Sequence, residues 1–331
     1  MNTNMDENLQ NSDPEKSPEH KDDEDEGNGQ VDYSNKLNPI ISPISAAFIG
    51  LFGGFFLYQI VGGILTLLIF GLDVEKAPVN GFRLMTMAGQ VLFILLPALL
   101  FSKWFYEDVT TVIRFKPSRW KEIGLFVIGI IILTPLLQNF VVIQNYFIDK
   151  LASSSATVNS VKSVFDSLND KVETTYSNLI TAHSIPEGML VILVVAAVPA
   201  VCEEVMFRGF IQKSFELKFK PYLAILITSV FFGLYHFNPY GLIPLIALGF
   251  YFGFAAYISD SIFTSMSLHF LNNFVAVIMF FFAGNEDVMS PSVNNAVDLK
   301  SSITIFVSLL VIFSGVIFMI VKYYKDKKSY V

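Results

Sequence analysis

The sequence contains a single cysteine, Cys202, and few charged side chains for a chain of 331 residues. One cysteine excludes a disulfide bond within the chain and a metal cluster built from several cysteines. Lys, Arg, Asp and Glu together make up only 15% of the residues. We find no stretch that resembles a soluble catalytic domain and no clear internal repeat.

The chain is rich in apolar residues instead: 53% of it is hydrophobic, with 33 Phe and a mean hydropathy of +0.54. Several runs reach about 20 residues, the length that crosses a membrane as a helix. The pattern predicts an all-α, polytopic membrane helix bundle with about eight transmembrane helices. The first and fourth segments are longer than a membrane requires, and the fifth is short. The eight segments are 40–72, 84–102, 123–143, 188–217, 221–237, 240–258, 261–283 and 302–322.

The N-terminal part differs sharply from the rest. Residues 1–39 hold 11 acidic and 3 basic residues, a charge of -8, so the remainder of this chain of net charge -7 comes to +1. Few apolar residues and no periodicity predict a disordered, solvated acidic tail. A tail that binds a basic partner is the alternative. The tail lacks the basic start and apolar core of a signal peptide. The helical bundle is predicted over 40–325.

Basic residues predict the orientation of the bundle. Three connecting regions (103–121, 213–220 and 322–328) carry 12 basic residues, against 6 in the loops on the other side. Because cytoplasmic loops are enriched in Lys and Arg, both termini are expected in the cytoplasm and the protein in the cell membrane. The polar segment 144–187 has weak helical periodicity and is expected either at the membrane interface or as a cap on the bundle.

Small residues at Gly249 and Gly253 allow two helices to approach closely. Packing inside one bundle is the preferred interpretation and homodimerisation the alternative, so the oligomeric state stays open.

A small set of polar side chains interrupts the later apolar segments. An ionisable group in the hydrocarbon layer costs at least ~2.5–3.5 kcal/mol, so such groups face the bundle interior and find partners. Asp260 lies at a predicted turn and needs no such explanation. The others are Glu203, Glu204, Arg208, His236, His269, Asn272 and Asn273.

Helical spacing predicts which of these groups pair. Glu204 and Arg208 are four residues apart and share a face. Glu203 points about 100° away from Glu204 and is left without that partner. In a hairpin that turns near residues 218–221, Glu203 and His236 lie level with each other, so they can face one another.

His269 and Asn273 are again four residues apart and share a face of the next-to-last segment. A Glu and a His that converge, with a His and an Asn opposite, can hydrolyse a bond through an activated water. No nucleophilic Ser with a nearby base occurs among these groups, and the acid beside Cys202 does not favour its thiolate. Helix clamps, or the proton relay of a carrier, are the alternative interpretations.

The same residues resemble the three motifs of the CAAX protease and bacteriocin-processing (CPBP, or Abi) family of intramembrane endopeptidases. All three occur in order on successive apolar segments, and the resemblance covers about 185–285. The motifs are Glu203-Glu204-x-x-x-Arg208, Phe232-x-x-x-His236 and His269-x-x-x-Asn273.

The resemblance implies a role for each motif. Glu203 with His236 would activate water, and His269 with Asn273 would form the oxyanion hole. Supporting roles would fall to Glu204, Arg208 and Phe232.

The family includes the eukaryotic endopeptidase that acts on prenylated CAAX proteins and bacterial members linked to bacteriocin immunity. The expected function is therefore a glutamate-type intramembrane endopeptidase of membrane-associated proteins or peptides. The alternative is a non-catalytic scaffold or immunity protein that binds peptides. No cofactor and no nucleic-acid partner are expected. Zinc is disfavoured because the H-E-x-x-H pair is absent and Asn273 is an uncommon zinc ligand.

Overall fold

The computed structural model describes residues 37, 39–71, 77–283 and 299–329. Within these ranges every regular element is a helix, which confirms the predicted all-α class. The predicted acidic tail lies outside the described residues, apart from Leu37 and Pro39.

Seven helical spans in the described part of the chain are long and apolar enough to cross a membrane. These seven spans, together with the apolar exterior of the helices, make the chain an integral, multi-pass membrane protein. The spans are Pro43–Phe70, Val79–Tyr106, Trp120–Ser154, Ile185–Glu216, Leu242–Ser259, Ile262–Phe282 and Leu299–Lys327.

Three of the spans contain π-helical turns. The first consists of α1 (Pro43–Phe55), η2 (Phe56–Val61) and α2 (Gly62–Phe70). The second consists of α3 (Val79–Gln90), η4 (Val91–Leu95) and α4 (Leu96–Tyr106). The fourth consists of α8 (Ile185–Val191), η5 (Ile192–Ala197), α9 (Val198–Glu204), η6 (Val205–Ile211) and α10 (Gln212–Glu216). Such turns are rare and often lie at functional sites.

The other spans are single helices: α6 (Trp120–Ser154), α12 (Leu242–Ser259), α13 (Ile262–Ala283) and α15 (Leu299–Ser329). The fifth predicted segment, 221–237, corresponds to α11 (Pro221–Leu234), which has 14 residues and is too short to count among the seven spans. It rises about 21 Å, less than the ~30 Å hydrocarbon layer. Helix α11 is therefore too short to cross the membrane by itself.

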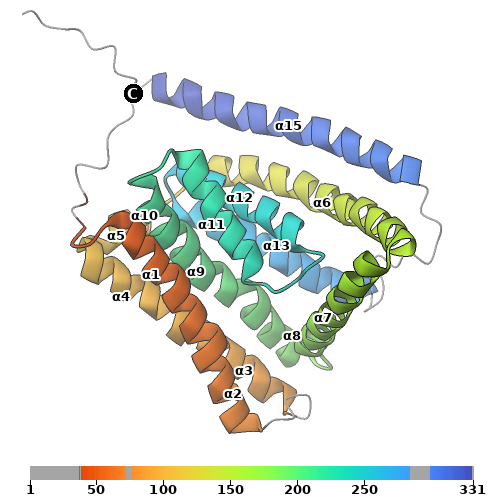
Figure 1. Ribbon diagram of the computed structural model, residues 1–331. Helices are drawn as coiled ribbons and strands as arrows, with labels where there is room; N and C mark the ends of the chain where they lie inside the picture. Colours follow the sequence, from red (N-terminus) through yellow and green to blue (C-terminus); the bar gives the residue numbers. More distant parts are fainter. Residues whose placement is uncertain (1–36, 38, 72–76, 284–298, 330–331) are drawn as a thin grey trace, which may run out of the picture. The chain divides into compact units, whose positions relative to one another are not determined.

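The segment 144–187 is more ordered than its weak periodicity predicts. Helix α6 continues to Ser154, and α7 (Ala156–Ile180) follows directly, with the Ser155 hydroxyl accepting from the Val158 amide at its N-terminus. A short helix, α5 (Val109–Val112), precedes α6. Helix α7 joins two membrane spans and packs against α6, α3 and α8, so it caps the end of the bundle where they meet (Figure 1).

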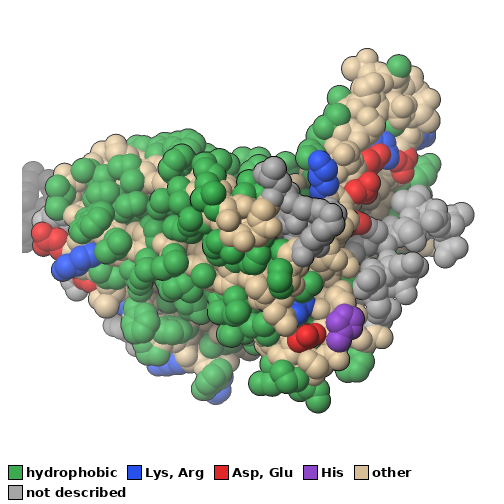
Figure 2. All heavy atoms as spheres, turned by 90° about the horizontal axis from the view of Figure 1, so that it is seen from below, with side chains coloured by type: hydrophobic (Ala, Val, Ile, Leu, Met, Phe, Trp, Pro, Cys, Tyr) green, Lys and Arg blue, Asp and Glu red, His purple; other side chains and the backbone are tan. Residues whose placement is uncertain are grey.

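The span from α8 to α10 forms the centre of the bundle. More than half of its most apolar stretch is buried, a larger share than in any other span of the described chain. On one side it packs against α1 and α4, and on the other α6 and α15 lie side by side (Figure 1). Hydrophobic side chains cover most of the face in Figure 2, as expected of a surface in contact with lipid.

The two small residues of α12 pack inside the bundle, as preferred from the sequence. A Cβ at Gly249 would lie 3.0 Å from the Phe232 ring, and one at Gly253 would lie 2.6 Å from Oε1 of Gln212. The bare backbone also exposes carbonyls to the neighbouring span, where Arg208 and Gln212 donate to them. These glycines therefore let α12 approach the central span.

Candidate active site

The two adjacent glutamates end α9 and point to different surroundings. Glu204 is fully buried, with 0% of its surface exposed, whereas Glu203 is partly buried and lines a cavity. The π-helical turn η6 begins directly after them. The predicted divergence of the two side chains is therefore present in the structure.

Glu204 lies in a buried cluster of three charged or ionisable groups. Its Oε1 accepts from Nη1 of Arg208 at 2.9 Å and from Nδ1 of His269 at 2.8 Å. Arg208, 1% exposed, also donates through Nη2 to the Gly249 carbonyl at 3.2 Å. The Glu204–Arg208 pair predicted from helical spacing is thus confirmed, and His269 joins it from α13.

The Phe232 ring contacts three other motif side chains, those of Arg208, His236 and His269. The Arg208 guanidinium carbon lies 4.2 Å from the ring centroid, a cation–π contact. The His236 ring lies 4.7 Å away and the His269 ring 6.1 Å, both edge-on. The two imidazoles therefore flank one aromatic ring.

His236 follows the end of α11, in the turn before α12, rather than lying on the helix. Its Nδ1 is 2.7 Å from the Phe232 carbonyl oxygen. A carbonyl oxygen only accepts, so Nδ1 carries the hydrogen and Nε2 is the proton-accepting nitrogen of the neutral ring. The spacing of the F-x-x-x-H motif thus sets the tautomer of its histidine.

A cavity of about 180 Å³ brings Glu203 and His236 together. Its walls come from α1–η2, α3–η4, α9–η6 and the turn after α11. His236 is exposed, so it lies where the cavity opens. The polar side chains that line the cavity are Tyr58, Gln59, Gln90, Glu203, Tyr235 and His236.

His269 and Asn273 share a face of α13, as their spacing predicts, and both point to the central span. His269 contacts Glu204, however, and Asn273 donates through Nδ2 to the Val195 carbonyl in η5 at 3.0 Å. The adjacent Asn272 donates to Oδ1 of Asn273 at 3.1 Å. Their predicted role as an oxyanion hole stays a prediction.

Comparison with known families gives a match to part of the chain. Residues 185–275 match a family model described as type II CAAX prenyl endopeptidase Rce1-like. This confirms the resemblance to the CAAX protease and bacteriocin-processing family, a protease family, and supports hydrolase activity in general terms. No curated protein and no solved structure matches the chain.

All seven motif residues lie inside the Rce1-like segment, but one contact of the site comes from outside it. Gln90, at the end of α3, donates through Nε2 to Oε1 of Glu203 at 3.0 Å. No local spacing predicts a contact across 113 positions. The sequence does contain one signal that points to Gln90: its amide lies inside the apolar segment 84–102, where a polar group needs a partner.

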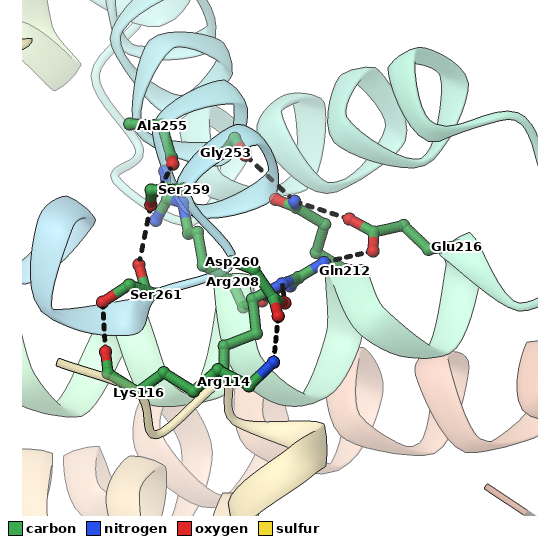
Figure 3. A network of polar contacts seen from close by, with 10 residues as sticks. All are labelled: Arg114, Lys116, Arg208, Gln212, Glu216, Gly253, Ala255, Ser259, Asp260 and Ser261. Carbon is green, nitrogen blue, oxygen red and sulfur yellow. Dashed lines mark hydrogen bonds and ion pairs between the residues drawn. The ribbon is translucent and has the colours of Figure 1, made fainter. Parts of the chain in front are cut away.

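A second polar network joins η6 and α10 to α12 and to the connection before α6 (Figure 3). Arg114, 2% exposed, donates through Nη1 to the Arg208 carbonyl at 2.7 Å and forms an ion pair with Glu216 through Nη2. Gln212 donates to Glu216 at 2.8 Å and to the Gly253 carbonyl at 3.1 Å. Arg114 therefore fixes the backbone of the residue whose side chain holds Glu204.

Asp260, which we expected to serve only as a turn residue, also belongs to this network. It ends α12 in a left-handed conformation with φ 48°. Its carboxylate lies 3.6 Å from Nε of Arg114 and forms an ion pair with Lys116.

The turn that carries His236 is held from outside the Rce1-like segment by α6 and α7. The Tyr240 hydroxyl donates to Oδ1 of Asp166 in α7 at 2.5 Å, and its ring meets the Phe165 ring edge-on. Gln144 of α6 donates to the Tyr240 carbonyl at 3.0 Å. Helix α7 therefore contributes to the position of the His236 turn.

Proposed function

We propose that this chain is an intramembrane, glutamate-type endopeptidase that hydrolyses peptide bonds of membrane-associated proteins or peptides. One observation carries the proposal: Glu203 and His236, from two different motifs of the Rce1-like segment, line the same cavity. The other acid, Glu204, is already matched by Arg208 and His269. One carboxylate is thus bound in a structural cluster, while its neighbour is available to a substrate in the cavity.

In the proposed reaction, a water lies between Glu203 and His236. The Glu203 carboxylate accepts one of its protons as the oxygen attacks the carbonyl carbon of the scissile bond. Nε2 of His236 accepts the second O–H and orients the water, because Nδ1 is bonded to the Phe232 carbonyl. Glu203 then passes its proton to the leaving nitrogen as the carbon–nitrogen bond breaks.

His269 and Asn273 are proposed to stabilise the oxyanion of the tetrahedral intermediate. Asn273 uses one N–H for the Val195 carbonyl, which leaves its second N–H for a substrate. His269 uses Nδ1 for Glu204, so a bond to the oxyanion requires a proton on Nε2 as well.

The cell membrane is the proposed location, with both termini in the cytoplasm, because the basic regions around α5, α10 and the end of α15 alternate with less basic connections. In this topology the short α11 and its neighbour α12 enter and leave the membrane on the same side, and the other six spans cross it. The proposed partners are the lipid bilayer and a protein or peptide substrate. No metal is assigned a role.

The test is a comparison of membrane peptides from cells that produce the wild type, Glu203→Gln or no protein. Peptide termini that appear only with the wild type support the proposal and identify the substrate. Identical peptide sets from wild-type and Glu203→Gln cells, with both proteins present at equal amounts, contradict it and favour a peptide-binding scaffold.

A further inference from the structure

The Glu203 carboxylate receives a hydrogen bond from a residue that none of the three motifs contains. Gln90 is 5% exposed, and its Nε2 lies 3.0 Å from Oε1 of Glu203. A buried amide in a membrane span is costly without a partner, and this contact supplies one. The other oxygen of Glu203, Oε2, is buried without a hydrogen-bond partner among the described residues.

We propose that Gln90 is a positioning residue, which holds the Glu203 carboxylate in the orientation that accepts the proton of the attacking water. The inference rests on the proposed function, since it takes Glu203 as the base. With Oε1 bonded to the amide, the carboxylate rotation is fixed and Oε2 is the oxygen left for the water.

The backbone supports this role. Gln90 is the last residue of α3 before the π-helical turn η4, and η6 begins one residue after Glu204. The Tyr58 ring from η2 lies 3.2 Å from the position of a Cβ at Gly89, directly beside Gln90. Three helix distortions therefore meet at this contact, and a rigid surrounding is what keeps a catalytic group in its productive geometry.

An amide suits the task better than a cation. Arg208, the nearest cation along the helix, is bonded to Glu204 and not to Glu203. A cation beside Glu203 would stabilise its negative charge strongly and weaken it as a base. A neutral N–H donor orients the carboxylate at a smaller loss of basicity.

The test uses Gln90→Met, which keeps the size of the side chain and removes its N–H donors. Two quantities are measured on purified protein in lipid bilayers: turnover of a peptide identified as above, and the rate at which a hydrophobic carbodiimide labels Glu203, located by mass spectrometry. The bond from Gln90 occupies Oε1 of Glu203 and fixes the carboxylate, so its loss leaves the group freer to react with the carbodiimide. Labelling of Glu203 in Gln90→Met should therefore be several-fold faster than in the wild type.

Turnover should fall by about 10²-fold in kcat with KM unchanged, the expected result of a misplaced base. Gln138→Met, which removes an exposed amide of α6, is the matched control and should label and turn over like the wild type. Should Gln90→Met fail to fold, Gln90→Leu, which also lacks N–H donors, replaces it. It should give the same loss of kcat and faster labelling of Glu203.

Faster labelling together with reduced kcat supports the inference. Wild-type labelling in a folded Gln90 variant overturns it, whatever the turnover, and so does faster labelling with unchanged kcat. The labelling needs no substrate, so it separates this inference from the proposed function. Retained cleavage by Glu203→Gln would refute the proposed function instead.

Discussion

His269 and Arg208 donate to the same oxygen of Glu204, at 2.8 and 2.9 Å. One donor comes from α13 and the other from η6, so a single buried carboxylate joins two helices. Removal of a partner from such a group leaves an uncompensated charge inside the bundle. The shared oxygen therefore gives the second glutamate of the E-E pair a structural role that the first does not have.

We expect Arg208→Ala and Glu203→Gln to separate stability from activity. Arg208→Ala should lower the free energy of unfolding by about 3–5 kcal/mol, because it removes the cation that pairs with the buried Glu204, to which His269 still donates. Glu203→Gln should abolish turnover with little change in Tm, because its amide can still accept from Gln90. Thermal melts in detergent provide the comparison, and equal losses of Tm would show that Glu203 also clamps the bundle.

Arg114 should be as important for stability as Arg208. Arg114→Ala removes the donor to the Arg208 carbonyl and leaves Glu216, 7% exposed in its side chain, without its closest cation. A loss of about 3–5 kcal/mol is expected, together with reduced turnover. Arg119→Ala, an exposed charge in the same connection, should change the free energy of unfolding by no more than about 0.5 kcal/mol. Similar melts for the two variants would contradict a positioning role for Arg114.

The bond between Tyr240 and Asp166 should support the turn that carries His236. Tyr240→Phe keeps the ring contact with Phe165 and removes the hydroxyl. The expected cost is about 1 kcal/mol of stability, with turnover reduced several-fold because His236 is less well placed. Tyr222→Phe, at an exposed position of α11, is the control. A Tyr240→Phe enzyme with wild-type kcat would mean that α7 is not needed to hold the turn.

Low pH should weaken the hydrogen bond between Tyr240 and Asp166. Lys162 donates to Asp166, and Tyr240 adds a second bond, so the pKa of Asp166 lies below its usual range. A lowered pKa in the folded state means that this stabilisation is complete above the ordinary value of about 3.9 and is lost as the pH falls below it. The difference in Tm between wild type and Tyr240→Phe should therefore be present at pH 7 and shrink below about pH 4. An unchanged difference in acid would contradict a charge-assisted bond.

The apolar runs predict most of the fold, because a chain in lipid must satisfy its backbone groups within helices. The i,i+4 rule also predicts the Glu204–Arg208 pair, since both residues lie on one continuous helical span. Contacts between spans are different. His269 meets Glu204 across 65 positions and Gln90 meets Glu203 across 113, and no local pattern encodes either distance.

The hairpin geometry shows the limit of reasoning with ideal helices. Equal distances from the turn place Glu203 and His236 level on two straight helices, yet α11 ends at Leu234. The two side chains still line one cavity, because the turn after α11 lies within the depth of the bundle. The polar segment 144–187 has too little apolar periodicity to predict α7, whose position depends on its contacts with α6, α3 and α8.

The last prediction concerns metal. Two histidines and a glutamate can in principle bind zinc and leave the open position that a catalytic site requires. In this chain the Nδ1 atoms of both rings already have hydrogen-bond partners, which leaves Nε2 as the nitrogen that could bind a metal. Nδ1 of His269 is bonded to Glu204, and Nδ1 of His236 to the Phe232 carbonyl. Zinc binding by Nε2 of both rings together with Glu203 would require these groups to converge on one point.

We expect purified protein to keep its turnover of the identified peptide after exhaustive chelation, because Glu203 and His236 can activate water without a Lewis acid. Elemental analysis of the same sample measures bound zinc, and a zinc-dependent peptidase treated in parallel verifies that the chelation is complete. Turnover that disappears on chelation and returns with one equivalent of zinc would contradict the glutamate mechanism. Glu203, His236 and His269 would then be metal ligands, and Glu203→Gln should reduce zinc content as well as turnover.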